Sequence, residues 1–334
     1  MKRNQFGALI IVAVILVLAA AGCIGQSSRP IRIAISAWAG VEPAELAARL
    51  GYYEKNGVDV KMVRFSAYSD SIEALRAGKT DAGMHTLDDA IRHRAAGRDV
   101  QIVLLTDYSH GADGIVARRG IDSVADLKGT TVGVELATVG HFSLLKALEM
   151  AGLSEKDITI VNIPAWEIKE AFLAGKIDAG VTWEPYLTSS AEEGDGTIIV
   201  TSQAYPESIV TSMVFDAETI RQRPDDVQRV VKAYFEAVDY MAAHPQEANH
   251  IMAEAEGVSD EEFAAHLGGI RILDRNANVD LLADSPNGRF YQTAREMAEF
   301  LAEKKVIRQA IDVATLFEPR FVLSLQPQDP SSTQ

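Results

Sequence analysis

The chain has 334 residues, of which 47% are apolar and 24% charged, a composition typical of a globular protein of about two domains. Its net charge is −15 and its lysines and arginines are scattered, which excludes the continuous basic face that a nucleic-acid-binding protein needs. The single cysteine, Cys23, excludes a disulfide within the chain and any metal site built from several cysteines.

The first 30 residues have the features of an export segment and a tether. Lys2 and Arg3 precede an uncharged apolar run over residues 7–21, and three small residues stand directly before Cys23. This order predicts a signal peptide over residues 1–22. It also resembles a bacterial lipobox, although Ala20 stands where leucine is usual.

The lipobox resemblance implies cleavage before Cys23, lipidation of Cys23 and a lipidated tether over residues 23–30. The alternative is an uncleaved anchor, although the apolar run is shorter than the roughly 20 residues of a full membrane span. Both alternatives place the rest of the chain outside the cytoplasm, anchored to the outer face of the cytoplasmic membrane.

Strand and helix patterns alternate in the first third of the chain. Ile31–Ile35 is a β-branched run that predicts a strand. Glu42 and Pro43 open a helix, and Gly78 ends a later one. In chain order, strands are expected at 31–35, 58–65, 81–84 and 100–105, with a helix after each of the first three and a loop over 106–111.

An eleven-residue motif occurs twice. Glu73–Gly83 and Glu170–Gly180 are identical at eight of eleven positions, with an offset of 97 residues that is too long for a solenoid repeat. Strands expected at 131–134 and 158–163, each followed by a helix, repeat the order found before the first copy. The repetition predicts two similar lobes, each a parallel sheet with helices on both faces. Because both copies share them, the aspartate and lysine of the motif are expected to serve the scaffold.

Two segments are expected to connect the lobes. Residues 111–117 leave lobe 1, and the β-branched run 208–215 returns to it. Two such crossings side by side would form a hinge. From Arg221 onward the pattern is helical, and these helices are expected to pack on lobe 1. The predicted domains are lobe 1 at 31–112 plus 213–322, lobe 2 at 113–212, and a disordered tail at 323–334.

Several segments resemble one branch of bacterial solute-binding proteins. They are Ala-Gly-Lys-x-Asp-Ala-Gly at 77–83 and 174–180, Ser-Val-Ala-Asp-Leu-Lys-Gly-Thr-Thr-Val-Gly at 123–133, and Trp-Glu-Pro-Tyr at 183–186. Over about residues 31–322 the chain resembles the nitrate/sulfonate/taurine-binding substrate-binding lipoproteins of ABC importers, a branch that includes binders of the thiamine pyrimidine precursor.

The resemblance implies an α/β, type II periplasmic-binding-protein fold with two similar lobes of mainly parallel sheets joined by two crossings. It also implies capture of a small-molecule solute between the lobes and delivery to an ABC permease and its ATPase. The branch covers anions, amino-sulfonates and pyrimidines, so the resemblance leaves the ligand open.

In open α/β sheets, ligands bind beyond the carboxyl ends of strands and at helix N-termini. This rule selects residues at the predicted strand ends, including all three tryptophans of the chain. Each has a structural alternative, such as core filling for a tryptophan, a structural hydrogen bond for a histidine or helix capping for Glu184. The predicted ligand-binding residues are Trp38, Tyr68, Ser69, His85, Thr86 and Asp107 in lobe 1 and Glu135, Thr138, His141, Trp166, Trp183 and Glu184 in lobe 2.

The balance of charged residues bears on the ligand. Four carboxylates lie at or near the predicted strand ends, and neither lysine nor arginine is expected there; they are Asp70, Asp107, Glu135 and Glu184. Carboxylates beside aromatic faces favour a cationic or amino-bearing solute. We therefore expect a taurine- or sulfonate-like solute, an amine or an aminopyrimidine rather than nitrate, although backbone N–H groups and hydroxyls would also hold an anion.

Other functional classes have weaker support. The chain contains neither Gly-x-Ser-x-Gly nor a Walker phosphate loop, and it lacks the His-rich, Cys-containing motif of the related pyrimidine-precursor synthases. Such an enzyme is therefore a minor alternative. A ligand-sensing subunit of a membrane receptor would have the same fold and anchor. The sequence predicts an ABC-importer solute-binding protein without catalysis, cofactor, metal site or nucleic-acid partner.

Overall fold

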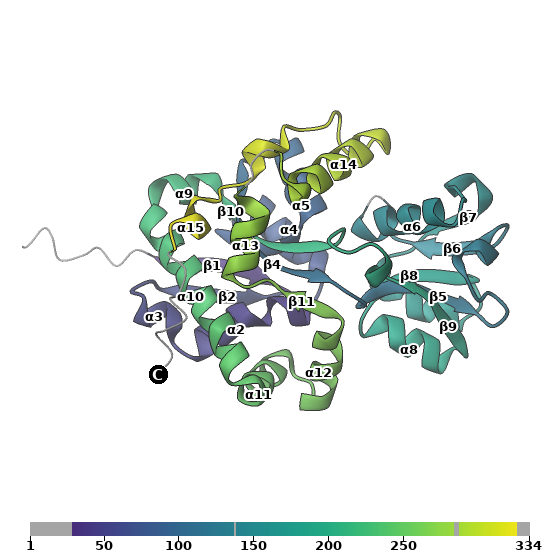
Figure 1. Ribbon diagram of the computed structural model, residues 1–334, viewed down its shortest axis with the longest axis horizontal. Helices are drawn as coiled ribbons and strands as arrows, with labels where there is room; N and C mark the ends of the chain where they lie inside the picture. The colour runs from purple at the N-terminus through teal and green to yellow at the C-terminus, as the bar shows by residue number, and fades with distance from the viewer. Residues whose placement is uncertain (1–28, 137, 284–286, 326–334) are drawn as a thin grey trace, which may run out of the picture.

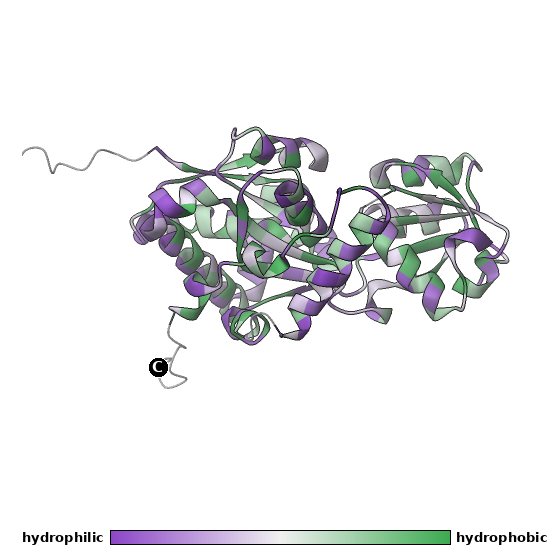
Figure 2. Ribbon diagram, turned by 90° about the horizontal axis from the view of Figure 1, so that it is seen from above, coloured by the Kyte–Doolittle hydropathy of each residue, from purple (hydrophilic) through white to green (hydrophobic). Residues whose placement is uncertain are grey.

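Two α/β lobes lie side by side in the computed structural model, which describes residues 29–136, 138–283 and 287–325 (Figure 1). Each lobe is built on one β-sheet with helices packed around it. The central strands are mostly hydrophobic, and hydrophilic residues lie on the outer helices (Figure 2). No helix within these ranges is long and apolar enough to cross a membrane. The predicted signal peptide and Cys23 lie outside the described residues.

The sheets of the two lobes have equivalent strand orders. Lobe 1 carries the order β11-β4-β10-β3-β1-β2 and lobe 2 the order β7-β6-β8-β5-β9. The strands are β1 (Ile31–Ile35), β2 (Val60–Arg64), β3 (Ala82–Thr86), β4 (Val100–Ser109), β5 (Asp113–Arg118), β6 (Thr131–Val134), β7 (Thr159–Asn162), β8 (Ala179–Trp183), β9 (Gly196–Thr201), β10 (Val210–Asp216) and β11 (Ile270–Ile272). The prediction of two similar α/β lobes is confirmed.

Both sheets are mainly parallel, as predicted, because four of the six strands of lobe 1 and four of the five strands of lobe 2 run in one direction. Strands β1, β2 and β3 are parallel to one another, as are β6, β7 and β8. In each lobe an antiparallel strand, β10 or β5, lies between the third strand and the fourth. Strand β11 adds a further antiparallel edge to lobe 1.

The helices of the C-terminal section cover lobe 1, as predicted. Helices α10 and α11 pack against α2, α14 packs against α5, and α15 packs against β4. The helices are α2 (Glu42–Arg49), α3 (Tyr52–Lys55), α4 (Tyr68–Arg76), α5 (Leu87–Ala95), α6 (Val139–Met150), α7 (Ile168–Leu173), α8 (Tyr186–Glu193), α9 (Ala217–Gln222), α10 (Pro224–Ala243), α11 (Pro245–Glu256), α12 (Asp260–Gly268), α13 (Arg275–Leu282), α14 (Arg289–Glu303) and α15 (Arg320–Leu323).

The duplicated motif ties the third strand of each lobe to the first. The backbone N–H of Arg32 donates to the Asp81 carboxylate at 2.9 Å, and that of Thr131 donates to the Asp178 carboxylate at 2.8 Å. In return, each aspartate donates its own N–H to the carbonyl of the same partner at 2.8 Å. The shared aspartate is therefore part of the scaffold, as predicted from its presence in both copies.

Strand β4 is longer than the sequence predicts. A strand ending at Leu105 and a loop over 106–111 were expected, but β4 continues to Ser109. The extra residues pair on both sides, because Asp107 lies opposite Thr211 of β10 and Ile272 of β11. The partner strands come from distant parts of the chain, so the local pattern did not reveal this extension. As a result Asp107 lies within the sheet.

The two connections between the lobes run side by side, as predicted for a pair of crossings. One joins β4 to β5 and the other joins β9 to β10. The hydroxyl groups of Ser109 and Ser202 are hydrogen-bonded at 2.8 Å, and the Gly111 N–H donates to Ser202 Oγ at 2.7 Å. Gly111 has a φ of +126°, a conformation that L side chains rarely adopt. Its freedom allows the first crossing to turn beside the second.

The ends of the described chain are attached to lobe 1. Arg29, within the predicted tether, donates two hydrogen bonds of 2.7 Å to Asp81. The predicted tail begins too early, because Leu323 still belongs to α15 and the Ser324 hydroxyl donates to Gln228 at 2.8 Å. The rest of the predicted tail, residues 326–334, lies outside the described residues.

Asp81 makes fold stability dependent on pH. Burial alone would raise the pKa of its carboxyl group, but hydrogen bonds from Arg29 and Arg32 lower it to about 2 from 3.8. The carboxylate therefore stabilises the fold above pH 4, and this contribution is lost as the pH falls toward 2. Because both arginines are partly exposed, we expect Asp81→Asn to lower the free energy of unfolding by only about 1–2 kcal/mol at pH 7.

Urea unfolding from pH 7 down to the acid limit of the protein measures this difference. The difference in unfolding free energy between wild type and Asp81→Asn should become smaller below pH 4. Asp178→Asn, at the matching turn of lobe 2, is the control for the backbone contact alone. If this difference stays constant down to the lowest accessible pH, Arg29 and Arg32 do not stabilise the ionised Asp81 carboxylate.

Candidate functional site

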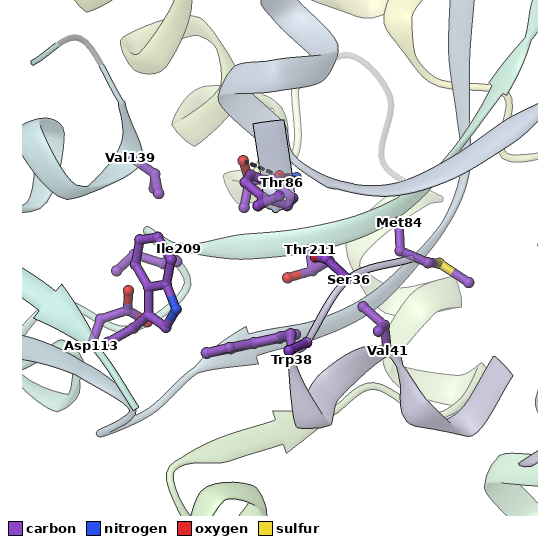
Figure 3. Close-up of a pocket in the computed structure, with 12 residues that line it drawn as sticks. Ser36, Trp38, Val41, Met84, Thr86, Asp113, Val139, Ile209 and Thr211 are labelled. Carbon is purple, nitrogen blue, oxygen red and sulfur yellow. Dashed lines mark hydrogen bonds between the residues drawn. The ribbon is translucent and has the colours of Figure 1, made fainter. Parts of the chain in front are cut away.

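A cleft lies between the lobes and has three adjoining compartments. The main compartment is lined from both lobes (Figure 3). Trp183 lines all three compartments, and Asp113 lines the main and inner ones. The main compartment is lined by Ser36, Ala37, Trp38, Val41, Tyr68, Met84, Thr86, Asp113, Val139, Trp183, Ile209 and Thr211.

Trp38 is held in place by a buried carboxylate behind it. Its Nε1–H donates to Asp107 Oδ1 at 3.0 Å, and the Thr106 hydroxyl donates to Oδ2 at 2.8 Å. Burial raises the pKa of Asp107 to about 6, although hydrogen bonds from Trp38, Thr106 and Thr211 oppose the rise. Asp107 is fully buried, so the structure places it behind the cleft wall, where it orients the indole.

Gly40 makes the Trp38–Asp107 contact possible. A Cβ atom at this position would lie 2.5 Å from both Asp107 Cγ and Trp38 Nε1, closer than real Cβ contacts allow. Any larger residue would therefore push the indole and the carboxylate apart. This close approach, not an unusual backbone angle, is the reason for a glycine at position 40.

A polar network supports the other lobe 1 residues of the cleft. The Tyr68 hydroxyl donates to Asp89, and the Thr86 backbone N–H donates to the Tyr68 hydroxyl at 3.0 Å. Burial, followed by the neighbouring Asp89, raises the pKa of Asp88 to about 7. Burial would also raise the pKa of Asp89, but the Arg92 guanidinium holds it below its ordinary value. These contacts fix Tyr68 and Thr86 at the surface of the main compartment.

The outer compartment is lined from both lobes, and the inner compartment is lined by lobe 2. Trp166, from a short 3₁₀ turn (Ala165–Glu167), lines the outer compartment with Trp183 and Glu184. The Glu184 carboxylate accepts hydrogen bonds from Thr188 N at 3.1 Å and Oγ1 at 2.6 Å, so it serves the first turn of α8.

Glu135 and Thr138 line the inner compartment. Glu135 Oε2 accepts a hydrogen bond from the Ala165 N–H at 3.2 Å, and the Thr138 hydroxyl donates to the Glu135 carbonyl at 2.8 Å. Burial raises the pKa of the Glu135 carboxyl group. Both residues therefore lie at the cleft, and the side chain of each already makes a hydrogen bond within the protein.

Besides Asp107, which lies behind the wall, three predicted residues do not line the cleft. Ser69 is exposed in the first turn of α4. His85 is completely buried, lies 3.0 Å from the Ser71 hydroxyl, and has its pKa lowered to about 3 by burial. His141 is buried and pairs with Glu155 at 2.8 Å, facing the Phe300 ring of α14. Asp70, used in the ligand argument, is also exposed on α4 and outside the compartments.

Sequence reasoning missed Asp113, Ile209 and Thr211, which line the main compartment from the two crossings and the strands that follow them. The predicted crossings could have identified these residues, because a segment that connects two lobes passes the base of the cleft between them. Among the described residues, no group of three or more histidine, cysteine or acidic side chains is arranged to hold a metal ion.

Comparison with known proteins places the chain among bacterial binding proteins. Residues 40–248 match the family described as NMT1/THI5 like. The chain is 28% identical to a putative aliphatic sulfonates-binding protein of Bacillus subtilis over 95% of both chains. It is 24% identical to the taurine-binding periplasmic protein of Escherichia coli, over 91% of this chain and 97% of that one.

The fold matches a solved structure over almost its whole length. The aliphatic sulphonate binding protein SsuA from Escherichia coli superposes with a TM-score of 0.72 at 20% identity, covering 89% of this chain and 100% of that chain. At this identity the match establishes a shared fold, with two lobes around a cleft.

Gly40→Ala should displace Trp38 from Asp107. The added Cβ overlaps both groups, so we expect a loss of about 1–3 kcal/mol in unfolding free energy. In a variant with Trp166→Phe and Trp183→Phe, Trp38 is the only tryptophan, and its fluorescence emission should shift to longer wavelength. Gly268→Ala, where a Cβ meets nothing within 4 Å, is the control. Unchanged emission and stability would show that the contact is not constrained by position 40.

Proposed function

Because the chain belongs to the NMT1/THI5-like family, we propose that it is the extracytoplasmic solute-binding protein of an ABC importer. The observation that carries this proposal is a cleft with walls from both lobes, at the base of which two crossings run side by side. Such a hinge architecture suits capture of a solute between lobes that close on it. The closed form then docks on the permease, and the partner ATPase drives transport.

The proposed ligand is a small nitrogen- or sulfur-containing solute, either taurine- or sulfonate-like, an amine or an aminopyrimidine. Support comes from the names of the relatives, one for aliphatic sulfonates and one for taurine. The aromatic walls of the main compartment, Trp38, Tyr68 and Trp183, also suit a small organic molecule. Thr86 and Thr211 add neutral polar groups to these walls.

The proposed location follows from the N-terminal segment. We infer that residues 1–22 are removed as a signal peptide and that Cys23 is lipidated. The lipid would hold the protein on the outer face of the cytoplasmic membrane, where a solute-binding protein meets its permease. The relatives named as periplasmic support the extracytoplasmic side of this proposal.

Binding without catalysis is proposed for the cleft. Among the described residues that line it, no serine or threonine hydroxyl is hydrogen-bonded to a histidine, so the paired nucleophile and base of a hydrolase are not assembled there. The Ser71–His85 pair is buried in lobe 1 and does not line any of the three compartments.

Closure is supported by contacts between helices of different lobes. The ring of Phe300 on α14 lies edge-on to His141 and Phe142 of α6, with centroids 5.6 Å and 5.2 Å apart. Figure 1 shows α14 reaching across from lobe 1 toward α6. Lys146 also pairs with Glu296 at 3.2 Å, and Lys304 pairs with Glu155. These contacts connect the lobes outside the cleft and favour a closed arrangement.

Trp183→Ala should weaken solute binding by about 1–3 kcal/mol, the range expected for a buried aromatic contact. Mass spectrometry of the purified protein would identify any co-purifying solute, and calorimetric titration against taurine, sulfonates, amines and aminopyrimidines would measure its affinity. Met150→Ala, an exposed position of lobe 2, is the control. Tight nitrate binding with no response to the panel contradicts the proposed ligand class, and unchanged affinity in Trp183→Ala removes Trp183 from the site.

Phe300→Ala should reduce affinity without touching the cleft lining. Loss of two aromatic contacts, each worth about 0.5–1.5 kcal/mol, favours the open arrangement and so weakens any ligand that needs both lobes. Small-angle scattering of the ligand-free protein should give a larger radius of gyration. The control is Glu299→Ala on the exposed face of the same helix. Equal scattering curves for wild type and Phe300→Ala would show that α14 does not stabilise the closed arrangement.

A further inference from the structure

Asp113 lies at the base of the cleft, where the chain enters lobe 2. It is the first residue of β5 and pairs with Trp183 of β8. Only 7% of the residue is exposed, and it lines both the main and the inner compartment. Figure 3 shows Asp113 and Ile209 on one side of the main compartment and Thr211 on the other. Its carboxyl group is therefore enclosed, but it borders the space in which a solute would sit.

One oxygen of this carboxyl group has no partner within the protein. Oδ2 of Asp113 is buried and makes no hydrogen bond, while the Asp113 backbone N–H donates to Ser109 Oγ at 3.1 Å. A buried acceptor without a donor costs free energy, and a buried charge without a counter-charge costs more. Asp107 avoids this cost through its bonds to Trp38 and Thr106. Asp113 has one oxygen that a donor from the solute would satisfy.

The charges around Asp113 are negative. Among the described residues that line the three compartments there is neither lysine nor arginine. Glu135, Glu184 and Glu256 line them together with Asp113, and His266 lies in the outer compartment. Asp107 from β4 and Glu184 after β8 are the charged groups that act on Asp113, and Tyr205 also lies near it. A cation bound here would face carboxylates on several sides.

We propose that Asp113 determines the specificity of the cleft by accepting a hydrogen bond from a positively charged nitrogen group of the solute, an ammonium or a protonated aminopyrimidine. This inference rests on the proposed function, namely that a small solute binds in the cleft. The faces of Trp38, Tyr68 and Trp183 add cation–π attraction to the same group. An aliphatic sulfonate without an amine would bring only negative charge to this site, so it is not the preferred ligand.

Matched ligand pairs test the proposal directly. Taurine and ethanesulfonate share the sulfonate and differ by the ammonium, and 4-aminopyrimidine and pyrimidine differ by the amino group. With calorimetry on the wild-type protein, the amine-bearing member of at least one pair should bind 10-fold or more tightly than its partner. Asp113→Asn should reduce that preference at least 10-fold by weakening the amine-bearing member, and the amine-free member should bind no more weakly than before.

Glu256→Gln distinguishes a local contact from the net charge of the cleft. It removes one carboxylate from the outer compartment, where Arg64 and His266 act on Glu256. If Asp113 contacts the solute nitrogen, Glu256→Gln should change the preference several-fold less than Asp113→Asn. An equal loss in both variants would overturn the assignment of specificity to Asp113.

The stability of the empty protein separates a binding role from a structural one. Burial, with the Asp107 and Glu184 charges, raises the pKa of Asp113 from 3.8 to about 7, so its cost to the empty fold grows between pH 4 and pH 7 and is fully present above pH 7. Asp113→Asn should therefore melt at a higher temperature than wild type at pH 8, and the gap should close toward pH 4. A lower melting temperature at every pH would make Asp113 a structural residue and overturn the proposal.

The remaining outcomes are also decisive. If ethanesulfonate and pyrimidine bind as tightly as their amine-bearing partners, the inference fails while the proposed function stands. If none of the four compounds binds and no small molecule co-purifies with the wild-type protein, the proposed function and the inference fail together. Affinity for taurine should rise between pH 6 and pH 8, because the Asp113 carboxyl group ionises over this range while the ammonium group of taurine stays protonated.

Discussion

The direction in which the chain crosses between the lobes determines where the cleft lies. Strand β10 is antiparallel to both β3 and β4, so β4 runs in the same direction as β3. In the same way β9 runs in the direction of β8. The chain therefore leaves each lobe at the carboxyl edge of its parallel strands and enters the other lobe through an antiparallel strand that begins at the equivalent edge. Both carboxyl edges must face each other across the crossings.

This constraint also explains which predicted site residues reach the cleft. The rule that ligands bind beyond strand carboxyl ends selected Trp38, Tyr68, Thr86 and Trp183 without knowledge of the fold, and all four line the main compartment. His85 fails because side chains alternate along a strand: Met84 and Thr86 line the cleft, whereas His85 points toward Ser71 on the opposite side. A prediction at the level of strand ends does not resolve this alternation.

Other parts of the site depend on contacts between distant segments. The repeat at 73–83 and 170–180 was enough to predict two similar lobes, because the same aspartate serves the same strand pair in each. The antiparallel strands were not predictable from their own patterns, since a β-branched run does not reveal its direction in a sheet. Asp107 was expected in a loop and Asp113 in a linker for this reason. Their roles follow only from the pairing of β4 with β10 and of β5 with β8.

The two aspartates illustrate how a binding site differs energetically from the scaffold around it. Both are buried carboxyl groups with a raised pKa. Asp107 is matched by donors from its own chain, so its burial fixes Trp38 and is independent of any solute. Asp113 has an oxygen without a donor, so the protein without ligand retains a cost that a suitable solute removes.

The free-energy cost of the unpartnered Asp113 oxygen affects function through closure of the lobes. A solute shifts the equilibrium between open and closed forms only by the difference in its affinity for them. Residues of a single lobe contact the solute similarly in the open and the closed form. By contrast, a solute group that lies between Asp113 and the aromatic walls of both lobes is bound best in the closed form. The α6–α14 contacts stabilise the closed form for every solute, but satisfying Asp113 depends on the chemistry of the solute. In the proposed mechanism, selectivity therefore depends on Asp113 at the crossing, and the ease of closure depends on the contacts between α6 and α14.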